Sequence, residues 1–153
     1  MEEFKMADAD FANLARALRK VDFFAPMTIG QLEMVLPFVL LYRYKEGESV
    51  CKQGEEGDAF YIVRQGRVGV WVKKGFFSFA KKIAELGAGD FFGEMSLVTR
   101  EPRSATVACE TETTLFVLTS GNFKYVLQKN PAFQAELKQI VETRKFKSKH
   151  EGG

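Results

Sequence analysis

The middle of the chain alternates between short hydrophobic runs and glycine-bearing turns. The runs read PFVLLYRY, ESVCKQG, DAFYIVR, RVGVWVKK, KKIAEL, SATVAC and TTLFVL, and the turns between them include KEGE, GEEGD, RQG and GAGD. Turns that recur about every 8–12 residues between short strands are typical of a β-sandwich or barrel. The pattern therefore predicts an antiparallel β-structure over residues 37–119.

The first part of the chain has a helical period instead. Asp8 or Asp10 can cap a helix whose hydrophobic residues recur at helical spacing, namely Phe11, Leu14, Ala15 and Leu18. Thr28 is placed to cap a second, short helix. We expect helices within residues 9–36, preceded by a flexible lead-in over residues 1–8.

After the β-pattern the period changes from two to about 3.6 residues, which again indicates helix. Ser120 can cap a first helix, and the pair Asn130-Pro131 can end it and begin the next. One stripe of that last helix is formed by Phe133, Leu137, Ile140, Val141 and Arg144. We expect a hinged helix pair over residues 120–145 and a flexible tail over residues 146–153.

The composition fits a single domain with one hydrophobic core. The chain has 153 residues, of which 46% are hydrophobic and 27% charged, an ordinary balance for a globular protein. Its net charge of +2 is too small to argue for nucleic-acid binding. No apolar run is long enough to span a membrane, no secretory signal opens the chain, and Cys51 and Cys109 are isolated. We therefore expect a cytoplasmic protein with two free thiols.

The residue inventory weakens every catalytic interpretation. His150 is the only histidine and lies in the polar tail, whereas a His-based metal site, a Ser-His-Asp triad and a Cys-His pair all need a histidine in the folded part. The chain also contains no GxxxxGKS/T motif, so a P-loop is excluded. We expect no enzyme activity, no metal and no cofactor.

One stretch, from Phe91 to Val107, reads FFGEMSLVTREPRSATV and holds the parts of a phosphate site. Gly93 lets a ligand approach the backbone, and the residues after it favour a short helical turn whose first amides have no partner in the helix and attract an anion. Arg103 adds a planar fork that can bind two oxygens of one phosphate. Glu94 can accept a hydrogen bond from a sugar hydroxyl. Together these groups indicate a site for a ribose that carries a phosphate.

The sequence FGEMSLVTREPRSATV resembles the phosphate-binding cassette of the cyclic nucleotide-binding domain family. This family includes the regulatory subunits of protein kinase A, the bacterial catabolite activator protein and cyclic-nucleotide-gated channels, and the segment from Arg100 to Thr106 is most similar to bacterial potassium-channel domains. The resemblance extends over residues 9–145. It implies an α+β fold, an antiparallel β-roll of the double-stranded β-helix (jelly-roll) type with N-terminal helices and a hinged C-terminal helix pair.

The resemblance also implies which residues bind a cyclic nucleotide. Arg103 would pair with the exocyclic phosphate oxygens, Glu94 would accept from the ribose 2′-hydroxyl, and Ser104 would bind phosphate or base. The positions that would line the base or ribose, each equally compatible with a role in the core, are Val70, Ile83 and Ala84. The remaining expected ligand-binding residues are Phe92, Gly93, Met95, Ser96, Ala105 and Arg144.

In function, the resemblance implies a regulatory domain that converts ligand binding into movement of its C-terminal helices. Family members with serine at the position of Ser104 accept cAMP, so we expect cAMP as the ligand, with cGMP tolerated. The residues that can either close over the purine or simply pack in the core are Leu137, Ile140, Val141 and Arg144. The partner would be an unknown effector protein or a fused output domain.

Two other functions remain open at this point. A transcription regulator of the catabolite-activator type would need a helix-turn-helix after the last helix, and few residues follow Arg144. A sugar-phosphate enzyme could use the same anion site, but it lacks a general base there because Glu94 is committed to a hydroxyl and the only histidine lies in the tail.

The segment KKGFFSFAKK, from Lys73 to Lys82, is unusual for a hairpin because three phenylalanines lie between four lysines. Such a hairpin can contact a membrane surface or a protein partner. The interpretation we favour is a long hairpin whose phenylalanines fold back onto the roll, since loops of this kind often carry a small cluster of their own.

Overall fold

The computed structural model describes the backbone of residues 1–75 and 78–150 and the side chains of residues 1–75 and 78–142. Its strands form two antiparallel sheets with the orders β1-β2-β9-β4-β7 and β3-β8-β5-β6. The strands are β1 (Glu2–Phe4), β2 (Leu40–Tyr44), β3 (Ser49–Cys51), β4 (Ala59–Gln65), β5 (Val68–Val72), β6 (Lys81–Leu86), β7 (Phe91–Phe92), β8 (Thr106–Cys109) and β9 (Thr113–Thr119). The helices are α1 (Asp8–Leu18), α2 (Ile29–Val35), α3 (Ser120–Gln128) and α4 (Pro131–His150), with 3-10 turns η1 (Leu36–Phe38) and η2 (Glu94–Leu97).

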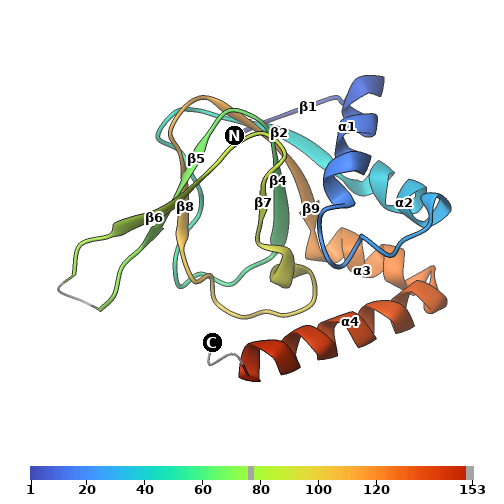
Figure 1. The fold of residues 1–153 in the computed structure, drawn as a ribbon. Helices are drawn as coiled ribbons and strands as arrows, with labels where there is room; N and C mark the ends of the chain where they lie inside the picture. The colour runs from blue at the N-terminus through green and yellow to red at the C-terminus, as the bar shows by residue number, and fades with distance from the viewer. Residues whose placement is uncertain (76–77, 151–153) are drawn as a thin grey trace.

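The two sheets face one another as a roll. Figure 1 shows α1, α2 and α3 on the side of the five-stranded sheet, with α4 running beneath the roll. Each of the seven hydrophobic runs contains one strand, and β7 is an additional short strand directly before the glycine of the phosphate cassette. The expected α+β fold, a β-roll with helices at both ends, is confirmed.

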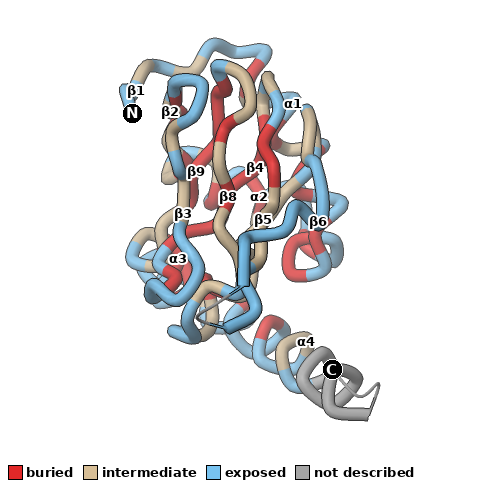
Figure 2. Tube along the Cα trace, turned by 90° about the vertical axis from the view of Figure 1, so that its left-hand side faces the viewer, coloured by how far each residue is buried: buried red, intermediate tan, exposed pale blue. Residues whose placement is uncertain are grey.

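Strand β4 is buried on both faces and separates two cores. Phe60 and Ile62 belong to the core between the five-stranded sheet and the helices, whereas Ala59, Tyr61 and Val63 face the inside of the roll. Successive residues of a strand point to opposite faces, so a strand covered on both sides needs a continuous hydrophobic run. The run AFYIV supplies it, and Figure 2 shows the resulting buried band through the middle of the molecule.

Phenylalanine rings dominate the core beneath the helices. Phe24 stacks on Phe60 with ring centroids 6.0 Å apart and meets the edge of Phe123 at 5.7 Å. Phe123 of α3 in turn contacts Phe133 of α4 at 6.2 Å. The segment before α2, the sheet and both C-terminal helices therefore share one core.

The expected flexible lead-in over residues 1–8 is wrong at Glu2–Phe4. These residues form β1 and pair with β2, from Glu2 opposite Arg43 to Phe4 opposite Leu41. Without β1, strand β2 would be an edge strand with unpaired backbone groups, which explains why the chain end is used to cover it.

Asp10 lies inside the first turn of α1 and is not its N-cap, a position held by Ala7. Its carboxylate accepts the Ala7 N–H at 2.9 Å and the Arg64 Nε at 2.6 Å. Burial raises the pKa of Asp10, but the hydrogen bonds from Arg64 and Ala7 outweigh burial and hold the pKa below its usual value. This ion pair ties α1 to β4.

The C-terminal helix pair is present, with α4 beginning at Pro131 as expected and with two corrections. Thr119, not Ser120, caps α3, because its Oγ1 accepts the Asn122 N–H at 3.1 Å. As expected, Asn130 closes the end of α3, where its side chain donates to the Val126 carbonyl at 2.8 Å. Helix α4 continues to His150, whereas we expected it to end at residue 145 with a flexible tail beyond.

The β5–β6 hairpin extends away from the roll (Figure 1). The Phe79 side chain is 96% exposed, so the expected folding of the phenylalanines back onto the roll is wrong for Phe79, and Phe76 and Phe77 lie outside the described residues. Over the part of the chain that the structure describes, no helix combines the length and hydrophobicity needed to cross a membrane.

Candidate functional site

The phosphate cassette runs from β7 through a glycine and a 3-10 turn into the loop before β8. Gly93 has a φ of +80°, which glycine adopts readily and other residues do not, and this turns the chain from β7 into η2. The Ser96 N–H donates to the Gly93 carbonyl at 3.0 Å, and the Thr99 hydroxyl donates to the Met95 carbonyl at 3.1 Å. The expected short helical turn is therefore present and is held from both ends.

Arg103 places a half-buried guanidinium beside this turn. Its Nη2 donates to the Ala59 carbonyl at 2.7 Å, and the guanidinium carbon lies 5.6 Å from the centre of the Tyr61 ring. A Cβ added to Gly93 would collide with Nη1 of Arg103, so the guanidinium lies directly against the backbone at Gly93. A guanidinium has five N–H donors, and one hydrogen bond to a carbonyl leaves it able to bind a phosphate.

The loop between β3 and β4 fixes the backbone of Arg103. The Arg103 N–H donates to the Glu55 carbonyl at 2.7 Å, and the Gly54 N–H donates to the Arg103 carbonyl at 2.8 Å. Buried Gly57 of the same loop has no room for a side chain, since a Cβ there would overlap Ser96 Oγ and lie 3.2 Å from Arg103 Nε. Gly57 therefore belongs to the candidate site, and our sequence analysis missed it because the turn GEEGD carried no signal beyond that of a turn.

Two ionisable side chains close to Arg103, Tyr61 and Cys51, stay uncharged. Burial raises the pKa of Tyr61 to about 12, although the nearby Arg103 lowers it. Burial likewise raises the pKa of the Cys51 thiol, again against the effect of Arg103. Both side chains are therefore neutral near pH 7 and do not offset the charge of the guanidinium.

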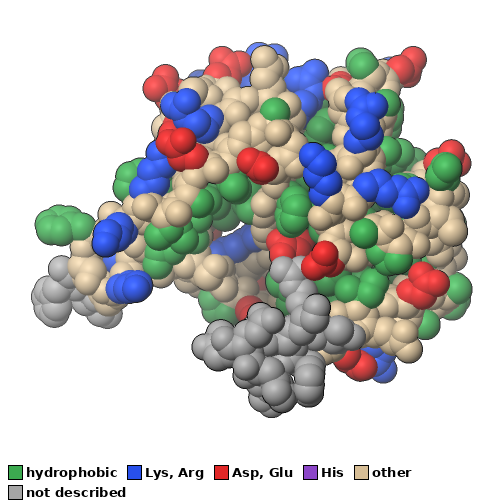
Figure 3. All heavy atoms as spheres, in the orientation of Figure 1, with side chains coloured by type: hydrophobic (Ala, Val, Ile, Leu, Met, Phe, Trp, Pro, Cys, Tyr) green, Lys and Arg blue, Asp and Glu red, His purple; other side chains and the backbone are tan. Residues whose placement is uncertain are grey.

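A cavity of about 420 Å³ lies on one side of Arg103, and its wall includes Tyr44, Cys51 and Tyr61. Four carboxylates also line this cavity, at Glu48, Glu55, Glu56 and Asp58. An anion would be repelled by these carboxylates, so the suitable place for a phosphate is the other side of the guanidinium, where Gly93 and η2 lie. Figure 3 shows the surface hollowed between β8 and β7, with a basic side chain inside the hollow.

Of the three residues expected to line the base or ribose, the structure brings two together. Val70 and Ala84 are directly paired across β5 and β6, and Val70 packs against the core inside the roll. Ala84 lies on the same face of the sheet as Val70, which faces the inside of the roll, yet it is exposed. The inside of the roll is therefore open to solvent at Ala84. Ile83 lies where the register shifts by one residue and is 60% exposed. Whether these residues contact a ligand stays a prediction.

The remaining predicted residues divide into core and surface positions. Phe92 stacks on Tyr61 with ring centroids 4.9 Å apart, and Met95 packs against the core beneath the helices. Ser96 is buried, Glu94 and Ala105 are half-buried, and Ser104 is exposed. The side chain of Arg144 lies outside the described residues.

Residues of η2 and α4 pack in the same core, which links the cassette to the C-terminal helices. Leu97 of η2 is buried in one cluster with Phe133 and Leu137 of α4, and Met95 packs against that cluster. In this state Leu137 is a core residue, only 3% exposed.

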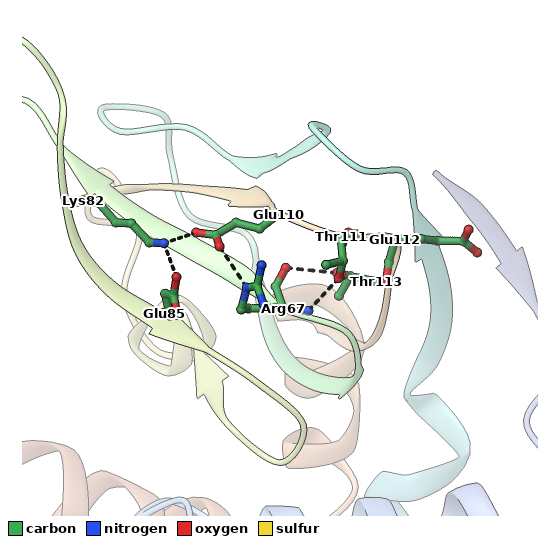
Figure 4. Close-up of polar contacts among 7 residues, drawn as sticks. All are labelled: Arg67, Lys82, Glu85, Glu110, Thr111, Glu112 and Thr113. Carbon is green, nitrogen blue, oxygen red and sulfur yellow. Dashed lines mark hydrogen bonds and ion pairs between the residues drawn. The ribbon is translucent and has the colours of Figure 1, made fainter.

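A second cluster of charged residues lies on the outer face of the four-stranded sheet (Figure 4). Glu110 forms an ion pair with Lys82 Nζ at 2.5 Å and accepts a hydrogen bond from Arg67 Nε at 2.9 Å, and Lys82 also pairs with Glu85. The Glu110 side chain passes over Gly69 of β5, where a Cβ would overlap Glu110 Oε1. This cluster connects β6 to the end of β8 across β5, and we assign it a structural role.

The charged cluster should make the free energy of unfolding depend on pH in the acid range. The hydrogen bonds from Lys82 and then Arg67 hold the pKa of Glu110 below its usual value, so the unfolded chain binds a proton more readily than the folded one. This contribution is fully present above the ordinary glutamate pKa and is lost as the pH falls through the lower folded value. We expect Glu110→Gln to show a shallower loss of stability in that acid range, measured by urea unfolding at a series of pH values.

Glu112→Gln is the matched control for this experiment. Its side chain is 67% exposed and points away from the cluster (Figure 4). An acid dependence of Glu110→Gln equal to that of the wild type would contradict the assigned role.

Comparisons with known sequences agree with this arrangement. A family model described as "Cyclic nucleotide-binding domain" matches residues 41–130. A cGMP-dependent protein kinase from Eimeria tenella is 30% identical over 138 residues, which is 86% of this chain and 13% of the kinase. A cyclic nucleotide-gated potassium channel from Rhizobium etli is 37% identical over 95 residues, which is 62% of this chain and 25% of the channel.

Solved structures show the same fold. The N-terminal domain of a transcriptional regulator from Streptomyces coelicolor has a TM-score of 0.78 at 25% identity and is matched over 90% of this chain and 95% of that domain. The regulatory domain of Toxoplasma gondii protein kinase A, solved with cAMP, has a TM-score of 0.68 at 25% identity, over 89% of this chain and 51% of that one.

Proposed function

Because this chain belongs to the cyclic nucleotide-binding domain family, we propose that it is the ligand-sensing part of a signalling protein and that its ligand is cAMP. The observation that carries the proposal is the position of the Arg103 guanidinium. It is held by the Ala59 carbonyl at 2.7 Å and lies against Gly93 at the start of η2. A phosphate placed there would meet the guanidinium fork and the first amides of η2 together.

The ribose of such a ligand would lie beside Glu94. This half-buried residue directly follows Gly93, and a carboxylate accepts a hydrogen bond from a hydroxyl but repels a phosphate. The ribose 2′-hydroxyl is free when the phosphate bridges the 3′ and 5′ oxygens. Val70 and Ala84, which are paired on the inward face of β5 and β6, would then face the purine.

Glu94→Ala should weaken cAMP binding by about 1–3 kcal/mol, because the 2′-hydroxyl would lose its acceptor. The variant should also lose the preference for cAMP over its 2′-deoxy analogue, as measured by calorimetry. Glu101→Ala is the matched control, since it removes an exposed carboxylate from the loop of the same cassette. If the analogue loses as much affinity for the variant as for the wild type, Glu94 does not bind the hydroxyl.

The choice between cAMP and cGMP rests on Ser104, whose exposed hydroxyl can reach a ligand. Relatives differ in this respect, since the E. tenella kinase is named for cGMP and the T. gondii regulatory domain was solved with cAMP. We propose cAMP as the preferred ligand and cGMP as a tolerated one. In a thermal-shift titration, cAMP should raise the melting temperature more than cGMP at equal concentration, because stabilisation grows with the ratio of ligand concentration to Kd. A larger shift with cGMP would reverse this order.

The proposed output is a movement of α3 and α4. Met95 and Leu97 of η2 pack in one core with Phe133 and Leu137 of α4, so a phosphate that displaces η2 alters the surface on which α4 packs. Hydrogen exchange of residues 131–142 should therefore change on addition of cAMP. Unchanged protection there would contradict the movement without contradicting the binding.

This domain would regulate a larger protein or a separate effector. The chain spans 13% of the kinase and 25% of the channel that it matches, so a fused output domain or a separate effector would use the movement of α4. We also propose a cytoplasmic location, supported by the two free cysteines, Cys51 and Cys109, which are typical of a reducing compartment.

A further inference from the structure

The β5–β6 hairpin carries a hydrophobic residue that is almost fully exposed. Phe79 is 96% exposed, and Ile83 on the same strand is 60% exposed. Figures 1 and 3 show this hairpin standing away from the rest of the molecule, with a hydrophobic side chain at its end. An exposed aromatic ring on a projecting element becomes a candidate contact for a membrane surface when basic residues flank it.

The hairpin also carries positive charge without compensation. Lys73, Lys74 and Lys81 are exposed, and they take part in none of the ion pairs found among the described residues. Lys82 differs, since its ammonium group is held by Glu110 and Glu85. No Asp or Glu occurs from Lys73 to Lys82, although the whole chain is close to neutral with a net charge of +2. The charge of the hairpin therefore fits an anionic surface.

A shallow recess at the neck of the hairpin adds a place for a polar head group. The recess has a volume of about 690 Å³, and its wall includes Trp71, Lys73 and Thr106. An indole, an ammonium and a hydroxyl are the groups that meet the head-group region of a bilayer, where tryptophan and lysine are favoured.

We propose that this hairpin docks the domain on a phospholipid surface that contains anionic lipids. Phe79 enters the boundary between head groups and acyl chains, and Lys73, Lys74 and Lys81 lie against lipid phosphates on both sides of it. A lipid surface accepts the projecting ring of Phe79 without a matching cavity, whereas a folded protein partner would need one. This proposal is independent of nucleotide binding.

Two hydrogen bonds connect the base of the hairpin to the loop between β3 and β4. The Gln53 side chain donates to the Lys73 carbonyl at 3.0 Å and accepts the Lys73 N–H at 2.8 Å. The next residue, Gly54, donates to the Arg103 carbonyl at 2.8 Å. Docking of the hairpin therefore also fixes the orientation of the cassette relative to the membrane.

The proposal is tested by sedimentation of the whole chain with vesicles. We expect co-sedimentation with vesicles that contain about one third phosphatidylserine, and little with pure phosphatidylcholine, because the surface potential comes from the anionic lipid. Salt at about 0.5 M should release most of the bound protein, since it screens exposed charges. Phe79→Ser should lower the partition coefficient about tenfold, and the double variant Lys74→Glu, Lys81→Glu by about 25-fold or more.

Two matched controls distinguish binding through the hairpin from nonspecific binding of the protein to vesicles. Ile29→Ser removes another exposed hydrophobic side chain (70% exposed), and the double variant Lys5→Glu, Lys124→Glu makes the same change of charge at exposed positions elsewhere. Both should bind the anionic vesicles within about threefold of the wild type. Absence of binding to anionic vesicles, or equal losses in the hairpin variants and their controls, would overturn the proposal. Thermal unfolding of each variant verifies that it is folded.

Discussion

Arg103→Ala should weaken cAMP binding by about 2–5 kcal/mol, the range seen when one partner of a buried charge pair is removed. The guanidinium that is lost lies half-buried against Gly93, with its Nη2 on the Ala59 carbonyl at 2.7 Å. The ligand phosphate would remain beside Gly93 without the guanidinium that pairs with it. Isothermal titration calorimetry measures the loss directly.

Arg100→Ala is the matched control, because Arg100 belongs to the same loop and carries the same charge. Its side chain is 73% exposed and pairs with Glu56 at 3.2 Å on the surface, so its removal should leave affinity nearly unchanged. Arg103→Lys should recover only part of the affinity, since a lysine keeps the charge but not the fork. Near-native affinity in Arg103→Ala would remove the basis for the phosphate site.

Gly93→Ala should damage both folding and binding. At a φ of +80° the alanine is strained by about 1–2 kcal/mol, and its Cβ would collide with Nη1 of Arg103 and lie 3.0 Å from the Ala59 carbonyl oxygen. The guanidinium would have to leave its position, so we expect cAMP affinity to fall by at least about tenfold. Urea unfolding gives the first effect and calorimetry the second.

Gly47→Ala is the matched control, because it introduces the backbone strain of Gly93→Ala without the collision with Arg103. Gly47 has a φ of +85°, close to that of Gly93, but no atom lies within 4 Å of an added Cβ. Both variants should therefore lose stability through backbone strain, Gly93→Ala by more because of the collision, and only Gly93→Ala should lose affinity. An equal loss of affinity in both would mean that Gly93 acts through general instability and not through Arg103.

Local patterns were sufficient to predict most of the elements. Alternation and glycine turns located the β-runs, and the helix after Thr28 begins with the predicted cap, whose Oγ1 accepts the Gln31 N–H at 3.1 Å. Gly93 was recognisable because the family cassette surrounds it, and the structure gives it the positive φ that glycine supports. These features depend on residues close together in the sequence.

The features that sequence analysis missed depend on contacts between distant segments. Strand β1 forms because it covers β2, which is far along the chain, and Asp10 is buried because Arg64 of β4 reaches it at 2.6 Å. Gly57 became a site residue only when the fold placed it against Ser96 and Arg103. Phe79 was misjudged because a hydrophobic residue in a hairpin predicts burial unless the hairpin is seen to extend away from the fold.

The central claim is that the cassette at Gly93, Glu94 and Arg103 binds a cyclic nucleotide. Calorimetric titration of the wild-type chain with cAMP, compared with 5′-AMP under the same conditions, tests this claim most directly. The account predicts saturable binding of one cAMP per chain and binding of 5′-AMP at least about tenfold weaker, because its phosphate does not bridge the ribose and carries a second charge near Glu94. Absence of cAMP binding, or equal affinity for the two nucleotides, would contradict it.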